Sequence, residues 1–126
     1  MSVVLDASAV LAILFDETGG DHALQSARGA LLSTVNLAEI LAKAAGRSID
    51  AHHAMMQVER LGIVTLPFST DEALLAATLL PATRAYGLSL ADRACLALGM
   101  SRKMPVLTAD RVWADLNIGI DIQLIR

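Results

Sequence analysis

The stretch VVLDASAVLAILF, residues 3–15, decides the fold class. Its first three residues form an apolar run that is too short for a helix and is followed directly by Asp6. From residue 7 to residue 15 apolar side chains return at helical spacing, with Val10, Leu11 and Leu14 on one face. A buried strand is therefore predicted to lead straight into a helix, which is the opening unit of a parallel α/β fold.

The same alternation continues along the chain. Further strands are predicted at residues 30–34, 63–66, 105–108 and 120–125, the last one at an edge. Helices are predicted at residues 21–28, 36–45, 50–60, 70–80 (with a further turn to 86), 90–99 and 110–116, and Gly99 is expected to end the helix that begins at residue 90. We therefore predict one α/β domain over residues 1–126, an α/β/α sandwich whose mainly parallel central sheet has about four to five strands.

Composition narrows the class of function. The chain is 55% hydrophobic and carries a net charge of −3, which argues against a broad basic surface that grips nucleic acid. Its apolar runs are all too short to span a membrane, and no secretory signal is recognisable, so we expect a cytoplasmic protein. Cys95 is the only cysteine and is expected to be a buried core thiol, and no Cys/His set has the spacing of zinc ligands.

Four carboxylates fall where a parallel sheet gathers its ligands. Asp6, Glu39, Asp92 and Asp110 each follow a predicted strand directly or lie near the start of a helix. In a parallel α/β sheet these places share the edge beyond the carboxyl ends of the strands. Two like charges about 4 Å apart repel by roughly 4 kcal/mol at an effective dielectric near 20, and a hard divalent cation relieves that repulsion.

Each of these acids also has an ordinary explanation. Asp92 fits a capping box with Ser89, Glu39 fits a related pattern with Asn36 or a pair with Lys43, and Asp110 fits a helix cap. What favours a site is Asp6, because an unpaired carboxylate at the end of a buried strand is costly. Whether Asp115 belongs to the site or faces water stays open at this stage.

Four motifs in order resemble those of PIN domains, and in particular of VapC-type toxins of bacterial toxin–antitoxin pairs. They are VVLDASA at residues 3–9, STVNLAE at 33–39, GLSLADRACLAL at 87–98 and VLTADRVW at 106–113. Each motif is short and weak alone, but the four together span nearly the whole chain.

The resemblance implies a metal-dependent endoribonuclease that is the toxin of a type II pair. It implies Asp6 and Asp92 as the first metal ligands and Glu39 and Asp110 as completing the acidic set around Mg²⁺ or Mn²⁺. Ser8 and Thr108 match hydroxyls that support the carboxylates, although both also read as turn or cap hydroxyls. A VapB-type antitoxin, an RNA substrate, a homodimer and no membrane are the partners and context that the resemblance implies.

Two other functions remain open from the residues alone. One is a non-catalytic PIN-like interaction module in which the acids are only helix caps. The other is a phosphotransfer protein with Asp6 as nucleophile, which Ser8 disfavours because such phosphatases usually carry a second Asp there. The pair Arg102–Lys103 is expected to lie in a loop and to be a better contact for RNA phosphates than Arg93 or Arg111, and the RNA target is not predicted.

Overall fold

Five parallel strands form the central sheet, in a computed structural model that describes residues 2–126. In spatial order they are β3 (Val64–Leu66), β2 (Leu31–Ser33), β1 (Val4–Leu5), β4 (Val106–Thr108) and β5 (Ile122–Leu124). Each neighbouring pair is parallel, with Val4 beside both Leu31 and Val106. The predicted parallel α/β sheet is therefore confirmed.

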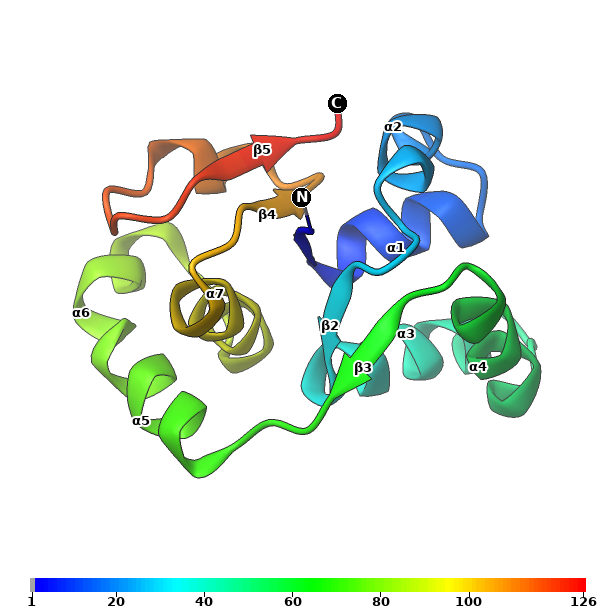
Figure 1. Cartoon of the computed structure of the whole chain (residues 1–126), viewed down its shortest axis with the longest axis horizontal. Coiled ribbons are helices and arrows are strands. Elements are labelled where there is room, and N and C mark those ends of the chain that lie inside the picture. The colour runs from blue at the N-terminus through cyan, green and yellow to red at the C-terminus, as the bar shows by residue number, and fades with distance from the viewer. Residues whose placement is uncertain (1) are drawn as a thin grey trace.

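Helices lie on both faces of this sheet (Figure 1). One face carries α1 (Ala7–Leu14), α2 (Gly20–Gln25), α3 (Thr34–Gly46) and α4 (Ala51–Arg60). The other carries α5 (Thr70–Thr78), α6 (Leu80–Thr83), α7 (Leu90–Arg102) and the 3-10 helices η1 (Arg84–Tyr86) and η2 (Arg111–Asp115). Among residues 2–126, none of the helices has the length and apolar character needed to cross a membrane.

Alternate residues of the strands build a core on each face. Leu5, Leu32 and Leu107 pack into the cluster under α1 to α4, whereas Val4 and Val106 pack into the cluster around α7. This is the two-residue alternation of side chains along a strand. Cys95 is a free thiol buried in the second cluster, as expected from its apolar neighbours.

Helix α7 does not end at Gly99, as the sequence predicted, but continues to Arg102. A Cβ atom at Gly99 would lie 2.5 Å from Cγ2 of Val106, so the glycine lets the helix approach strand β4. Lys103 ends the helix instead, in the left-handed conformation. The glycine therefore serves close packing here rather than helix termination.

The helix predicted for residues 110–116 is a 3-10 helix, η2, with Asp110 at its N-cap. Helix α3 begins earlier than predicted, directly after strand β2, because the Ser33 hydroxyl accepts the Val35 N–H and caps it. The strand and the helix that bears Glu39 therefore join without a loop.

Candidate active site

The strand order places a topological switch point beside β1. Strand β2 pairs with one edge of β1 and β4 pairs with the other, so the chain crosses over in opposite directions from this strand. Asp6 directly follows β1, and its N–H donates to the Leu107 carbonyl at 2.9 Å. Ligands of open α/β sheets bind at such points, beyond the carboxyl ends of the strands.

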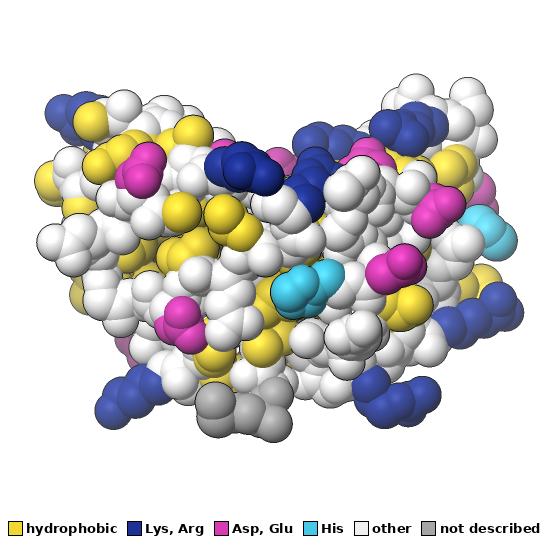
Figure 2. All heavy atoms as spheres, turned by 90° about the horizontal axis from the view of Figure 1, so that it is seen from above, with side chains coloured by type: hydrophobic (Ala, Val, Ile, Leu, Met, Phe, Trp, Pro, Cys, Tyr) yellow, Lys and Arg dark blue, Asp and Glu magenta, His cyan; other side chains and the backbone are white. Residues whose placement is uncertain are grey.

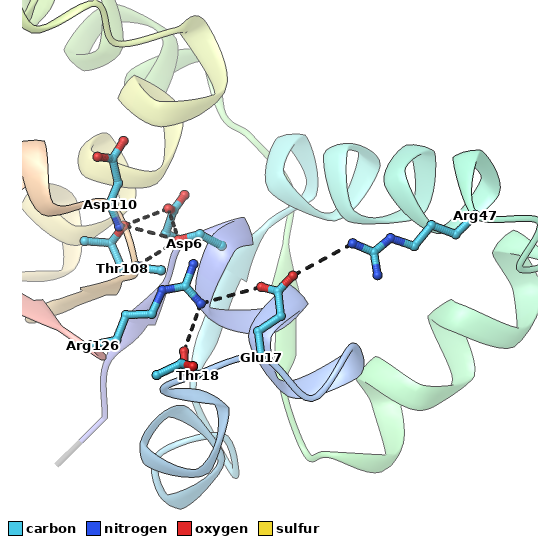
Figure 3. A network of polar contacts seen from close by, with 9 residues as sticks. Asp6, Glu17, Thr18, Arg47, Thr108, Asp110 and Arg126 are labelled. Atoms are coloured by element: carbon cyan, nitrogen blue, oxygen red, sulfur yellow. Dashed lines mark hydrogen bonds and ion pairs between the residues drawn. The ribbon is translucent and has the colours of Figure 1, made fainter.

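Asp6 is held by two hydroxyl groups at that point. The side chain is only 4% exposed, and its Oδ2 accepts hydrogen bonds from Ser8 Oγ at 2.6 Å and from Thr108 Oγ1 at 2.9 Å. Figure 3 shows Asp6 and Thr108 facing each other from neighbouring strands. Both hydroxyls thus support the carboxylate, as the family resemblance implied, and within residues 2–126 the other oxygen, Oδ1, accepts no hydrogen bond.

The same hydroxyls also fix the backbone after β4. Ser8 Oγ accepts the Ala109 N–H at 2.9 Å, and Thr108 Oγ1 accepts the Asp110 N–H at 3.0 Å. The supporting role and the turn role, which the sequence left open, therefore coexist in each hydroxyl. This network joins the start of α1 to the turn that carries Asp110.

Burial raises the pKa of Asp6 from 3.8 to about 6. The hydrogen bonds from Ser8 and Thr108 oppose this by stabilising the ionised form, while the negative charges of Asp92 and Glu39 raise the pKa further. Three of the predicted acids are therefore close enough to act on one another electrostatically. A cation among them would remove the repulsion and favour the ionised form of Asp6.

Asp92 and Glu39 reach this site from two helices that pack together, α7 and α3. The capping box predicted for Asp92 is present, because its Oδ2 accepts the Ser89 N–H at 2.9 Å while Ser89 Oγ accepts the Asp92 N–H. Asp92 is thus both a cap and a neighbour of Asp6. Within residues 2–126, no ion pair links Glu39 to Lys43.

Asp110 lies at the same edge of the sheet, but its side chain caps a helix. Its carboxylate is exposed, and Oδ1 accepts the Val112 N–H at 3.1 Å, so it caps η2. Figure 3 shows it beyond Thr108, next to Asp6. Asp115 is exposed at the far end of η2, where its carbonyl accepts from the Tyr86 hydroxyl at 3.4 Å. No contact of Asp115 with the other acids is seen in the part of the chain that the structure describes.

The donor set fits a hard cation in kind. Its side chains are carboxylates with hydroxyl support, which suit Mg²⁺ or Mn²⁺ rather than zinc. Across residues 2–126, however, no three Asp, Glu, His or Cys side chains are already gathered around one point. The described side chains therefore do not form a preassembled cation site.

Asn36 was predicted only as a cap partner of Glu39, but the N-cap of α3 is Ser33, and Asn36 has a different role. It is fully buried in the first turn of α3, and its Nδ2 donates to the Ala91 carbonyl at 2.9 Å. Ala91 precedes Asp92, and Asn36 precedes Glu39 by one helical turn. This amide therefore braces the helices that carry the two acids. Its place in the STVNLAE motif was the only signal.

Three of the basic residues considered as RNA contacts, Arg93, Arg102 and Lys103, do not lie beside Asp6. Arg93 donates from Nη1 to the Ala76 carbonyl at 2.9 Å and so joins α7 to α5. Arg102 and Lys103 lie at the opposite end of α7 from Asp92, which puts them about 15 Å from the site at 1.5 Å per residue. Arg102 is therefore the last residue of a helix and does not lie in a loop as predicted, and the contact of this pair with RNA stays a prediction.

Comparison with known proteins agrees with this geometry. A family model described as PIN domain matches residues 3–118. No curated protein matches the sequence. A toxin–antitoxin complex from Klebsiella pneumoniae has a similar fold, with a TM-score of 0.78 at 15% identity over 98% of both chains.

Two structures from Mycobacterium tuberculosis are also similar. A member of the VapBC family of toxin–antitoxin systems, VapBC-5, shares 27% identity over 99% of this chain and 98% of that one, with a TM-score of 0.66. VapC20, described as a toxin that cleaves the sarcin-ricin loop, shares 16% identity over 91% of this chain and 96% of that one, with a TM-score of 0.68.

Proposed function

Because the chain belongs to the PIN-domain family, we propose that it is a Mg²⁺- or Mn²⁺-dependent endoribonuclease, the toxin of a type II toxin–antitoxin pair. The observation that carries this proposal is the buried Asp6, whose pKa is raised by burial and by the charges of Asp92 and Glu39. A buried carboxylate that neighbouring carboxylates repel, at a topological switch point, is costly to a structural protein and useful to a metal enzyme. The similar fold of VapC20, an RNA-cleaving toxin, adds support.

Each side chain has a proposed task in hydrolysis of an RNA phosphodiester. Asp6 and Asp92 are the first metal ligands, and Glu39 and Asp110 complete the acidic set directly or through water. Ser8 and Thr108 hold Oδ2 of Asp6, which keeps Oδ1 directed away from the hydroxyls. A bound divalent ion supplies an acidified water and neutralises charge on the phosphate. No serine or cysteine nucleophile is needed.

The partners are proposed from the same relatives. The Klebsiella and VapBC-5 structures are toxin–antitoxin systems, which supports a VapB-type antitoxin for this chain as well. A groove between α1 and α4, lined by Leu14, Gln57 and Leu61, suits such a partner. We also propose a homodimer and a cytoplasmic location.

Cleavage of purified total RNA tests the proposed activity. The protein is incubated with Mg²⁺ or Mn²⁺ and, in parallel, with EDTA, beside Asp6→Asn and Asp92→Asn variants. Asp71→Asn, at an exposed position of α5, is the matched charge control. We expect discrete products with metal from wild type and control, and none with EDTA or from either site variant. Products that survive in both site variants would overturn the assignment.

A non-catalytic interaction module is the second candidate. It is favoured by one observation, that Asp92 and Asp110 already act as caps and the described carboxylates do not yet surround one point. Under this alternative the protein binds its partner with unchanged affinity in EDTA and cleaves none of the RNAs. Activity with metal, lost in both site variants, excludes it.

A further inference from the structure

Arg126 lies at the same sheet edge as Asp6. The Ile125 N–H donates to the Thr108 carbonyl at 3.0 Å, and β5 runs parallel to β4 with Leu124 beside Thr108. The residue after Ile125 therefore emerges where Thr108 meets Asp6. Figure 3 shows the Arg126 side chain extending from this edge toward the loop after α1.

That loop is fitted closely against the end of β5. Gly19 has a φ of +92°, and a Cβ atom on it would lie 2.5 Å from the Ile125 carbonyl oxygen. Only glycine allows this approach. As a result Arg126 Nη1 reaches the Thr18 carbonyl at 2.8 Å and the Glu17 carboxylate at 3.6 Å.

A second arginine approaches the same carboxylate from the other side. Arg47 Nη2 lies 3.9 Å from Glu17 Oε2, and its guanidinium lies 4.0 Å from the centre of the Phe15 ring. Stacking on an aromatic ring fixes the plane of a guanidinium and leaves its N–H groups free to bind anions. Arg47 and Arg126 thus face each other across Glu17 (Figure 3).

Both ion pairs of Glu17 are exposed and long, so another anion can replace the carboxylate. Glu17 and Arg126 have side chains 36% and 35% exposed, and Arg47 is 58% exposed. Neither pair is closer than 3.6 Å, and exposed pairs of this sort contribute little to stability. The Glu17 carboxylate lies between the two arginines, and a phosphate group could bind there in its place.

Other cations are present on the molecule, and they are placed differently. The net charge is −3, and on the face seen in Figure 2 Lys and Arg side chains are interspersed with acids. Arg111 is exposed directly after Asp110, Arg102 and Lys103 lie at the far end of α7, and Arg93 donates to the Ala76 carbonyl of α5. Among the ion pairs of residues 2–126, Arg47 and Arg126 are the two arginines that share one carboxylate.

We propose that Arg47 and Arg126 bind phosphates of the RNA strand that enters the acidic site, and that the strand displaces Glu17 from between them. This inference rests on the proposed ribonuclease function, because RNA is taken as the polyanion. It adds two residues that bind the RNA substrate outside the acidic site.

Binding to a short fluorescent single-stranded RNA tests this directly. All proteins carry Asp6→Asn so that the RNA stays intact, and affinity is measured across a series of salt concentrations. The variants are Arg47→Ala, Arg126→Ala and Glu17→Gln, and Arg28→Ala is the charge-matched control, exposed in the loop before β2 at the opposite end of the strands from Asp6.

Each arginine removed should weaken binding several-fold and lower the slope of log affinity against log salt by about 0.7, the value for one phosphate contact on a single strand. Glu17→Gln should tighten binding, which an unfolded variant cannot do. Arg28→Ala should change little. Unchanged affinity in both arginine variants, or equal losses in Arg28→Ala, would overturn the inference and would point to a protein partner for this cluster.

Failure here is separable from failure of the nuclease assignment. If total RNA is cleaved but the arginine variants bind normally, only the phosphate contacts are wrong. If the arginine variants lose RNA binding while wild type cleaves nothing, the contacts stand and the catalytic proposal falls.

Discussion

Asp6 ties the stability of the metal-free protein to pH. Its pKa is about 6 in the folded state and 3.8 when exposed to water, so the folded state holds the proton more tightly. This contribution to stability is complete below pH 3.8 and is lost as the pH rises through 6. A difference of about two units between the pKa values corresponds to roughly 3 kcal/mol.

Asp6→Asn should therefore stabilise the protein at neutral pH in EDTA, because asparagine keeps an acceptor for Ser8 and Thr108 without a charge. The advantage should shrink as the pH falls from 7 toward 4, where wild-type Asp6 becomes protonated. Urea unfolding of both proteins at several pH values measures this. A difference in unfolding free energy that does not change with pH would contradict the cause given for the pKa.

The Thr108 hydroxyl should be needed both for stability and for the site. Thr108→Val keeps the shape but removes the donor to Asp6 and the acceptor of the Asp110 N–H. We expect a loss of about 1–3 kcal/mol in unfolding free energy and a further rise in the pKa of Asp6. Thr78→Val, on the exposed side of α5, is the control, and it should change neither the unfolding free energy in urea nor the pKa of Asp6 appreciably.

At the residue scale, the features that short sequence motifs specify were predicted correctly. Asp6 and the Ser89–Asp92 capping box are visible because strand ends and caps have short sequence signatures. The contacts of Asn36 and Arg126 were missed, since their partners, Ala91 and Thr18, lie far away in sequence and no short pattern specifies such contacts.

At the element scale, Asn36 braces α3 against α7. Asn36→Ala should lose the bond to Ala91 and lower the unfolding free energy by about 1–2 kcal/mol. It should also weaken Mn²⁺ binding, because Glu39 lies on α3 and Asp92 on α7, and the lost hydrogen bond joins these two helices.

A destabilised protein away from the site separates these effects. Ser69→Ala removes the N-cap of α5, whose hydroxyl accepts the Glu72 N–H, and should cost a similar free energy of about 0.5–2 kcal/mol. It should leave Mn²⁺ affinity unchanged. Equal weakening of Mn²⁺ binding in both variants would mean that Asn36 acts only through stability.

Element boundaries were predicted less well than element types. The sequence indicated the order of strands and helices because apolar periodicity is a local signal. It did not indicate that α7 passes Gly99, since the reason lies in Val106 on another element. Similarly, η2 is held as a 3-10 turn by the Asp110 cap and by packing of the buried Trp113.

At the scale of the whole molecule, the order of strands makes the site. Strand β1 lies at the centre with β2 and β4 on either side, although β1 and β4 are separated by most of the chain. A parallel sheet was predictable from the alternating elements, and so was the position of Asp6 directly after the first strand. The order itself was not, because pairing of distant strands leaves no local pattern.

Titration of Mn²⁺ into the protein by calorimetry tests the central claim, that carboxylates distant in sequence form one metal site. Wild type and the exposed control Asp71→Asn should bind the ion, and Asp6→Asn and Asp92→Asn should lose that binding while remaining folded. If wild type binds no Mn²⁺, or if both site variants bind it as wild type does, these acids are not a metal site and the account is contradicted.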